Sequence, residues 1–167
     1  MNNNKETAKK RLMFIQKEDY NFLTYIMLLL LYTLDCSSES KKFRDFRKIA
    51  YLVDFINFGG KISDYNQNEL ANIYSKAQLK KQLLSHLIVV LKNQKYIDVD
   101  INTTHQSIDL WLNKENIPEG FFDKNFFEEE IKNIIALKQY AHSLKTVTVK
   151  NLVDTIFTNN NVITWEI

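Results

Sequence analysis

At 167 residues the chain is long enough for one compact domain, or for one domain with an appended helical arm. Hydrophobic content of 45% and charged content of 25% are ordinary for a globular protein and exclude a disordered or collagen-like chain. The formal net charge is only +2, but the charges are distributed unevenly along the sequence. A single cysteine, Cys36, excludes a disulfide framework and a multi-cysteine metal site, and three glycines with one proline favour a helix-dominated fold.

The N-terminal part of the sequence predicts neither a secretory signal nor a membrane span. Residues Met1 to Lys17 are polar and basic, without the apolar stretch that a secretory signal needs before its cleavage site. The strongest apolar stretch, Phe22 to Leu34, covers about 13 residues, whereas spanning a bilayer takes about 20. We therefore interpret it as a buried core helix and expect a cytoplasmic protein with no membrane role.

Two helices are predicted in the first third of the chain. A basic arm, residues 1–17, contains one apolar stretch, Leu12 to Ile15, that is able to dock on the core. An apolar helix is then expected from about Asp19 to Asp35. A second helix is expected from about Lys41 to Phe58, where Gly59-Gly60 ends it because glycine permits left-handed backbone.

The middle of the chain predicts two more helices followed by a β-hairpin. Ser63-Asp64 opens a short helix that includes residues 70–77, and a second helix follows from about Ala77 to Asn93. Polar and apolar residues then alternate over Tyr96–Ile101 and again over Ile108–Leu112, with a turn-rich segment between them. Two alternating runs around a short polar loop are typical of an antiparallel hairpin.

The last third of the chain returns to helix. Pro118-Glu119-Gly120 breaks the chain, after which Asp123 can cap a helix that runs to about Leu144. Apolar residues at helical spacing predict an amphipathic helix over residues 149–157. It begins after one of two candidate capping residues, Thr146 or Thr148. Val162–Ile167 can form a closing strand.

The order of elements favours a mainly α fold with a small β-hairpin, in which a winged-helix-like core is joined to C-terminal helices. We divide the chain into a basic N-terminal arm (1–17), a winged-helix-like core (18–113) and a C-terminal helical extension (114–167). A plain helical bundle with an edge hairpin is the alternative. Winged helices bind DNA or proteins, so this fold class does not settle function.

The charge distribution argues against DNA binding through the hairpin. Residues 41–48 carry about +4 and residues 76–95 about +5, whereas residues 98–130 carry about −7. The hairpin contains Asp98, Asp100 and Asp109 with no Lys or Arg, so like charge would meet the phosphates of a duplex. The outward face of the preceding helix fits a solvated surface, a protein-binding surface or base readout; its residues are Gln78, Gln82, Ser85, His86 and Val89.

No set of residues in the sequence points to catalysis, a metal or a cofactor. His86, His105 and His142 lie far apart and lack metal-ligand spacing. Cys36 would be a nucleophile only with a histidine packed against it, and Gly59-Gly60 lacks the pattern of a phosphate-binding loop. The consecutive acids Glu128–Glu130 point to different sides of a helix and suit its first turn. We therefore expect a protein that is not an enzyme.

A polar stripe on the helix predicted over residues 41–58 is the most informative surface feature. Two of the three arginines of the chain, Arg44 and Arg47, fall on one side of this helix together with Tyr51 and Asp54. Arginine offers a planar fork that suits a carboxylate partner or an interface anchor. An internal Arg47–Asp54 pair, contact with another protein, and contact with phosphate are the three interpretations.

Two segments of the sequence resemble a known family. Tyr20-Asn21-Phe22-Leu23 with its leucine-rich helix, followed by Lys42 to Ile56 (KFRDFRKIAYLVDFI), resembles the small middle component of bacterial three-component ABC-ATPase systems. In Lamassu-type anti-phage systems this subunit accompanies an ATPase that resembles structural-maintenance-of-chromosomes (SMC) proteins and a nuclease or other effector. Lys48 to Phe55 also resembles the start of Panacea-type antitoxins, but the Phe-Arg-Asp-Phe-Arg-Lys lead-in and the overall length favour the first family.

The first resemblance implies a non-catalytic adaptor that binds a coiled-coil, SMC-like ATPase subunit and a nuclease-type effector subunit, and meets DNA only through the complex. As a hypothesis, the polar stripe Arg44, Arg47, Tyr51 and Asp54 makes one partner contact. Four lysines of the segment 76–95 make the other: Lys76, Lys80, Lys81 and Lys92. The alternative is a winged-helix DNA-binding regulator or a Panacea-type antitoxin.

Overall fold

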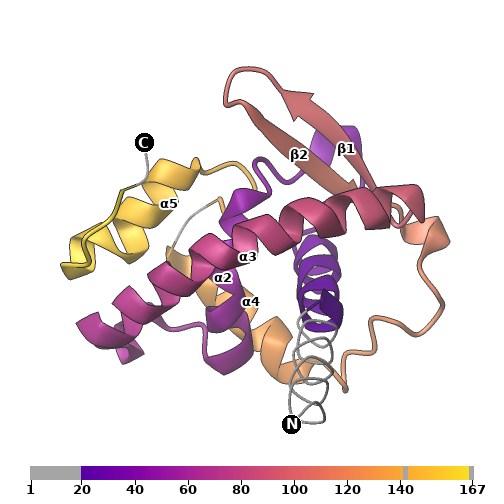
Figure 1. Cartoon of the computed structure of the whole chain (residues 1–167). Coiled ribbons are helices and arrows are strands. Elements are labelled where there is room, and N and C mark those ends of the chain that lie inside the picture. Colours follow the sequence, from indigo (N-terminus) through magenta and orange to yellow (C-terminus); the bar gives the residue numbers. More distant parts are fainter. Residues whose placement is uncertain (1–19, 141–142, 166–167) are drawn as a thin grey trace, which may run out of the picture.

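A computed structural model of the chain describes residues 20–140 and 143–165 (Figure 1). It is mainly helical with one two-stranded antiparallel hairpin, so the predicted fold class is confirmed. The predicted arm, residues 1–17, lies outside the described residues. The first helix covers residues 20–33 of the described chain and is buried on nearly all sides. None of the described helices is both long and apolar enough to cross a membrane.

Helix α2 (Arg47–Phe58) begins six residues later than the sequence predicts, so the predicted start at Lys41 is wrong. Residues Glu39–Lys41 form a short 3-10 helix, and Phe43 instead pairs with Leu110 of the hairpin, through N–O distances of 2.8 and 3.0 Å. Both the N–H and the carbonyl of Phe43 are used in these two hydrogen bonds, so the chain is extended at this residue. The helix ends as predicted at Gly59, whose φ of 152° suits glycine.

Helix α3 (Gln67–Asn93) is one continuous helix of 27 residues, so the predicted division at Ala77 is wrong. Its start is fixed by a capping box, in which Asn66 accepts from the Glu69 amide and Glu69 accepts from the Asn66 amide. Ser63-Asp64 forms a short 3-10 turn instead of the cap. A buried stripe runs along the whole helix and explains its continuity; it comprises Leu70, Ile73, Tyr74, Ala77, Leu84, Leu87, Ile88 and Leu91.

The predicted hairpin is confirmed as strands β1 (Ile97–Asn102) and β2 (Ser107–Leu112). The two strands are antiparallel, with Ile97 opposite Leu112 and Asn102 opposite Ser107. Three helices followed by a hairpin, with an additional bridge at Phe43, fit the predicted order of a winged helix. The winged-helix interpretation and the three domain boundaries stay predictions.

The C-terminal region contains helices α4 (Glu128–Tyr140) and α5 (Val149–Ile156). The expected start of α4 after Asp123 is wrong, because the residues after it form a turn in which the Asp123 carbonyl accepts from Phe126 and Phe127. Thr148 caps α5 by accepting from the Asn151 amide, which confirms one of the two predicted caps. Residues 162–165 form no strand, and the backbone amide of Trp165 donates to Tyr74 of α3 instead.

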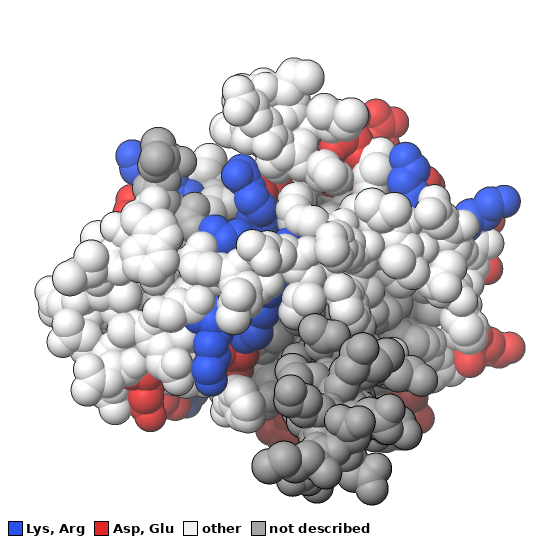
Figure 2. All heavy atoms as spheres, in the orientation of Figure 1, with Lys and Arg blue, Asp and Glu red and all other residues white. Residues whose placement is uncertain are grey.

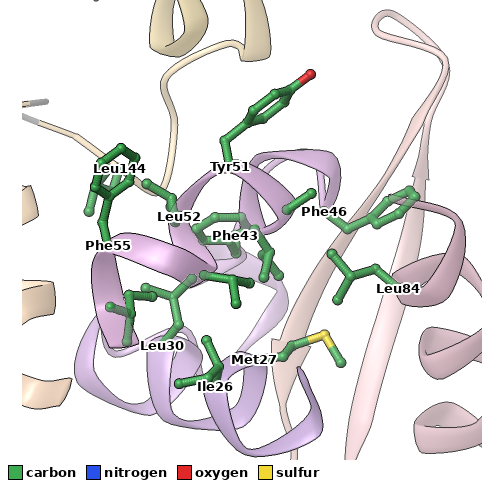
Figure 3. Close-up of a cluster of buried hydrophobic side chains, with 14 of the residues drawn as sticks. Ile26, Met27, Leu30, Phe43, Phe46, Tyr51, Leu52, Phe55, Leu84 and Leu144 are labelled. Atoms are coloured by element: carbon green, nitrogen blue, oxygen red, sulfur yellow. The ribbon is translucent and has the colours of Figure 1, made fainter. Parts of the chain in front are cut away.

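Helix α2 is the centre of the core, since it packs against α3, α4 and α5 (Figure 1). Every residue from Lys48 to Ile56 is buried. Figure 3 shows side chains of α2 meeting those of the first helix, the strand-like residue Phe43 and α3. Gly60 lies so close to α4 that an added Cβ would be 2.2 Å from the Asn133 carbonyl oxygen. The C-terminal helices are therefore built onto the same core as the first three.

Candidate interaction surfaces

The segment before α2 fixes the first two residues of the predicted polar stripe. Asp45 has a φ of 60°, and its backbone amide donates to Oδ1 of Asp109 at 2.9 Å. Its carboxylate accepts from Nε and Nη2 of Arg47 at 2.9 and 2.6 Å, so the predicted Arg47–Asp54 pair is wrong. Arg44 precedes the helix and is exposed, so it does not share a helix face with Arg47.

Tyr51 and Asp54 point into the fold rather than toward a partner. Tyr51 is fully buried, and its hydroxyl accepts from Nζ of Lys81 at 2.9 Å and from Nε2 of Gln78 at 3.3 Å. Asp54 is 8% exposed and forms an ion pair with Lys80. Two residues assigned to one partner contact and two assigned to another therefore meet in a single interface between α2 and α3.

The remaining predicted contact residues are on the surface. Arg44, Lys76 and Lys92 are exposed, and Arg47 is half-buried beside Asp45. Figure 2 shows Lys and Arg side chains gathered in the middle of one face of the molecule, around α3. Burial lowers the pKa of Lys81, as expected for a cation partly withdrawn from water. Partner contact through the exposed cations stays a prediction.

Lys48 was predicted only as part of a basic run, but it lies in the core. It is fully buried, and its Nζ donates to the carbonyl oxygens of Leu144 at 2.6 Å and Lys145 at 3.1 Å. Burial lowers its pKa to about 7. One signal could have placed it in the core: Lys48 shares i, i+4, i+7 spacing with Leu52 and Phe55.

Two of the three hairpin carboxylates share an ion pair with Lys42, which precedes α2. Asp109 is 1% exposed and accepts from the Asp45 amide and from the Asn102 side-chain amide. Nζ of Lys42 lies 3.3 Å from Asp109 and 2.5 Å from Asp100, and this ion pairing lowers the pKa of Asp100. The predicted acidic surface on the hairpin is therefore wrong for Asp109, which is buried. Asp100 stays partly exposed beside Lys42, and Asp98 forms no ion pair with a described residue.

The outward face of α3 combines exposed apolar and uncharged polar side chains. Leu79 and Val89 are 68% and 59% exposed. Three of the polar residues predicted for this face are indeed exposed: Gln82, Ser85 and His86. Gln78 is the exception, because it turns inward and donates to Tyr51. Leu79 was not predicted for this face, although it lies one turn from Gln82 on the same side of the helix.

The described residues contain no evident centre for covalent or metal chemistry. Cys36 is fully buried, and burial raises the pKa of its thiol to about 11, which keeps it protonated near neutral pH. Within residues 20–140 and 143–165 no three His, Cys, Asp or Glu side chains are grouped as metal ligands would be. His142, the third histidine considered above, lies outside these ranges.

Comparison with known proteins assigns no family to the chain. It matches no protein-family model, no curated protein and no solved structure. The resemblance to the small component of three-component ABC-ATPase systems therefore rests on the sequence segments described above.

Proposed function

We propose that the chain is a non-catalytic, cytoplasmic adaptor subunit of an SMC-like ATPase anti-phage defence complex, bridging the ATPase and a nuclease-type effector. The observation that carries this proposal is the outward face of α3, where Leu79 and Val89 are exposed among uncharged polar side chains. An adaptor must present such a face, because burying apolar surface drives most protein association.

The composition of this face favours a protein partner over a nucleic acid. Leu79 and Val89 are ten residues apart, so they lie about 15 Å from each other along the same side of the helix. A duplex rewards cations at the contact, whereas Lys80 and Lys81 of this helix are engaged with Asp54 and Tyr51 on α2. Lys80 and Lys81 thus hold the fold, and Lys76 and Lys92 are the α3 lysines that stay exposed beside the apolar side chains.

The residues that carry the family resemblance mostly build the core and do not identify a partner-binding surface. The segment that carries it, Lys42 to Ile56, supplies the bridge to the hairpin and the central core helix. Apolar motif residues at these positions are explained by packing. We therefore assign the ATPase contact to the exposed apolar residues of α3.

The proposal is tested by co-expressing the tagged chain with the genes that neighbour its own and isolating the complex. We expect an ATPase subunit to co-purify, and Leu79→Asp with Val89→Asp to weaken its binding about tenfold or more. The matched control is Phe58→Asp with Ile135→Asp, two side chains that are 75% and 50% exposed elsewhere. Equal ATPase binding by the wild type, the α3 variant and the control would contradict the assignment of this face.

A winged-helix DNA-binding regulator or Panacea-type antitoxin is the second candidate function. It is favoured by Lys42, which forms ion pairs with Asp100 and Asp109 and so offsets one of the three negative charges of the hairpin that oppose phosphates. This candidate predicts a dimer that binds DNA upstream of its own gene with a steep salt dependence. Fluorescence anisotropy on that DNA at two salt concentrations distinguishes it from the adaptor.

A further inference from the structure

An apolar groove lies between the C-terminal half of α3 and the first helix, beyond the α3 residues that contact α2. It consists of two adjoining hollows of about 500 and 540 Å³ that share Tyr25 and Phe121. These two rings stack, with centroids 5.2 Å apart and planes within 13° of parallel. The wall on one side comes from α3 and includes Val90, and the wall on the other includes Phe126.

The segment between β2 and α4 forms the outer wall of this groove. Figure 1 shows this segment, residues 113–127, passing around the first helix before it enters α4. The groove walls are mostly apolar, yet Tyr25, Val90 and Phe126 remain 45%, 49% and 78% exposed. Large apolar side chains gathered around a hollow in this way mark an interaction site more often than scattered exposed residues do.

The charge around the groove specifies the chemistry of its occupant. Residues 114–130 contain six carboxylates and two lysines, which gives a net charge of −4. Asp123 and Glu130 line one hollow, and Glu119 lies on the adjacent surface beside Gly120. None of these three carboxylates forms an ion pair with a described residue. The hollow beside Phe126 is therefore apolar along its floor and negative along its rim, whereas no charged residue of the described chain lines the hollow beside α3.

We infer that the groove binds an amphipathic helix of the partner ATPase, with an apolar stripe flanked by Lys and Arg residues. This inference rests on the proposed adaptor function and names the chemistry of one contact. No described strand borders the groove, so an extended peptide would find no backbone edge to pair with, whereas a helix satisfies its own backbone. The acidic rim supplies the complementary charge for the basic flanks.

The test measures binding of the purified full-length chain to the purified ATPase encoded beside it. We expect Val90→Asp and Phe126→Ala each to weaken binding about tenfold or more, while the matched controls Ile135→Asp and Phe58→Ala stay within about twofold of wild type. Reversing the rim charge with Asp123→Lys plus Glu130→Lys is expected to weaken binding and to flatten its salt dependence. The control for this pair is Glu39→Lys plus Asp64→Lys, two exposed acids outside the groove.

The outcomes separate this inference from the proposed function. Absence of wild-type binding contradicts the adaptor itself, whereas wild-type binding that survives Val90→Asp and Phe126→Ala overturns only the groove assignment. A wild-type dimer that Val90→Asp dissociates would place a second copy in the groove and overturn it too. The groove assignment would also be overturned if Phe14→Asp and Val90→Asp lowered the thermal stability equally and left the ATPase affinity unchanged. The occupant would then be the chain's own arm.

Discussion

The Nζ atom of Lys48 lies 2.6 Å from the carbonyl oxygen of Leu144, which ties α2 to the turn before α5. The same group donates to the Lys145 carbonyl and lies 4.3 Å from the centre of the Phe43 ring. No ion pair with a described residue compensates this buried charge. A cation placed in this way makes the stability of the core depend on pH.

Stability is expected to rise with pH because of Lys48. Burial lowers its pKa from 10.5 to about 7, so between these values the unfolded chain holds a proton that the native chain has released. The free energy of unfolding should therefore increase from pH 7 toward pH 10, by about 1.4 kcal/mol per pH unit at most from this group. Urea denaturation at several pH values, compared between wild type and Lys48→Met, isolates its contribution, and parallel pH profiles would refute it.

The ion pair between Lys80 and Asp54 should couple α3 to α2. Their side chains are only 18% and 12% exposed, so removing one partner leaves the other poorly solvated. We expect Asp54→Ala to cost about 1–3 kcal/mol of unfolding free energy, and a double-mutant cycle with Lys80→Ala to give a coupling of about 1 kcal/mol. Lys76→Ala, on an exposed lysine of the same helix, is the control and should cost under about 0.5 kcal/mol. Additive losses in the cycle would mean that the pair is not energetically coupled.

Gly60 is predicted to be intolerant of any side chain. A Cβ there would lie 2.2 Å from the Asn133 carbonyl oxygen, and because that atom belongs to the backbone, α4 itself must move. We expect Gly60→Ala to destabilise the fold by about 2 kcal/mol or more. Gly120→Ala provides the comparison, since its Cβ meets open space and only its φ of 78° is unfavourable, at about 1 kcal/mol. Equal melting temperatures for the two variants would contradict the close packing of α4.

The start of α3 is predicted to depend on its capping box. Asn66 and Glu69 satisfy each other's backbone amides at 3.0 and 2.8 Å. Asn66→Ala should therefore lower the unfolding free energy by about 1 kcal/mol. Asn72→Ala, an exposed position within the same helix, should be neutral or slightly stabilising because alanine has the higher helix propensity. A cap variant as stable as this control would show that the box contributes nothing.

Local sequence patterns were sufficient for the elements whose hydrogen bonds are local. The alternation of residues 96–101 and 108–112 predicted the hairpin, and the apolar stripe beginning at Val149 predicted α5 with its Thr148 cap. Phe43 shows the limit of such patterns. It lies within a helical pattern, but its partner is Leu110, far along the chain, and that pairing delays the start of α2.

The candidate surfaces were less predictable, because they depend on which polar groups the fold withdraws from water. Helical spacing placed Tyr51 and Asp54 on a polar stripe but could not show that α3 covers it and supplies Lys80 and Lys81 as partners. The groove had a weak sequence signal. The pairs Phe121-Phe122 and Phe126-Phe127 lie in a segment without helical periodicity, next to Pro118-Glu119-Gly120, and paired aromatics there have to pack on something outside their own element.

The adaptor account is tested most directly by measuring the mass of the complex that the full-length chain forms when it is co-expressed with its neighbouring genes. Size-exclusion chromatography with light scattering should show the chain in one species with a coiled-coil ATPase subunit. It should bind little DNA when isolated. A lone dimer that binds DNA upstream of its own gene in a salt-dependent manner would contradict the account and would establish the regulator instead.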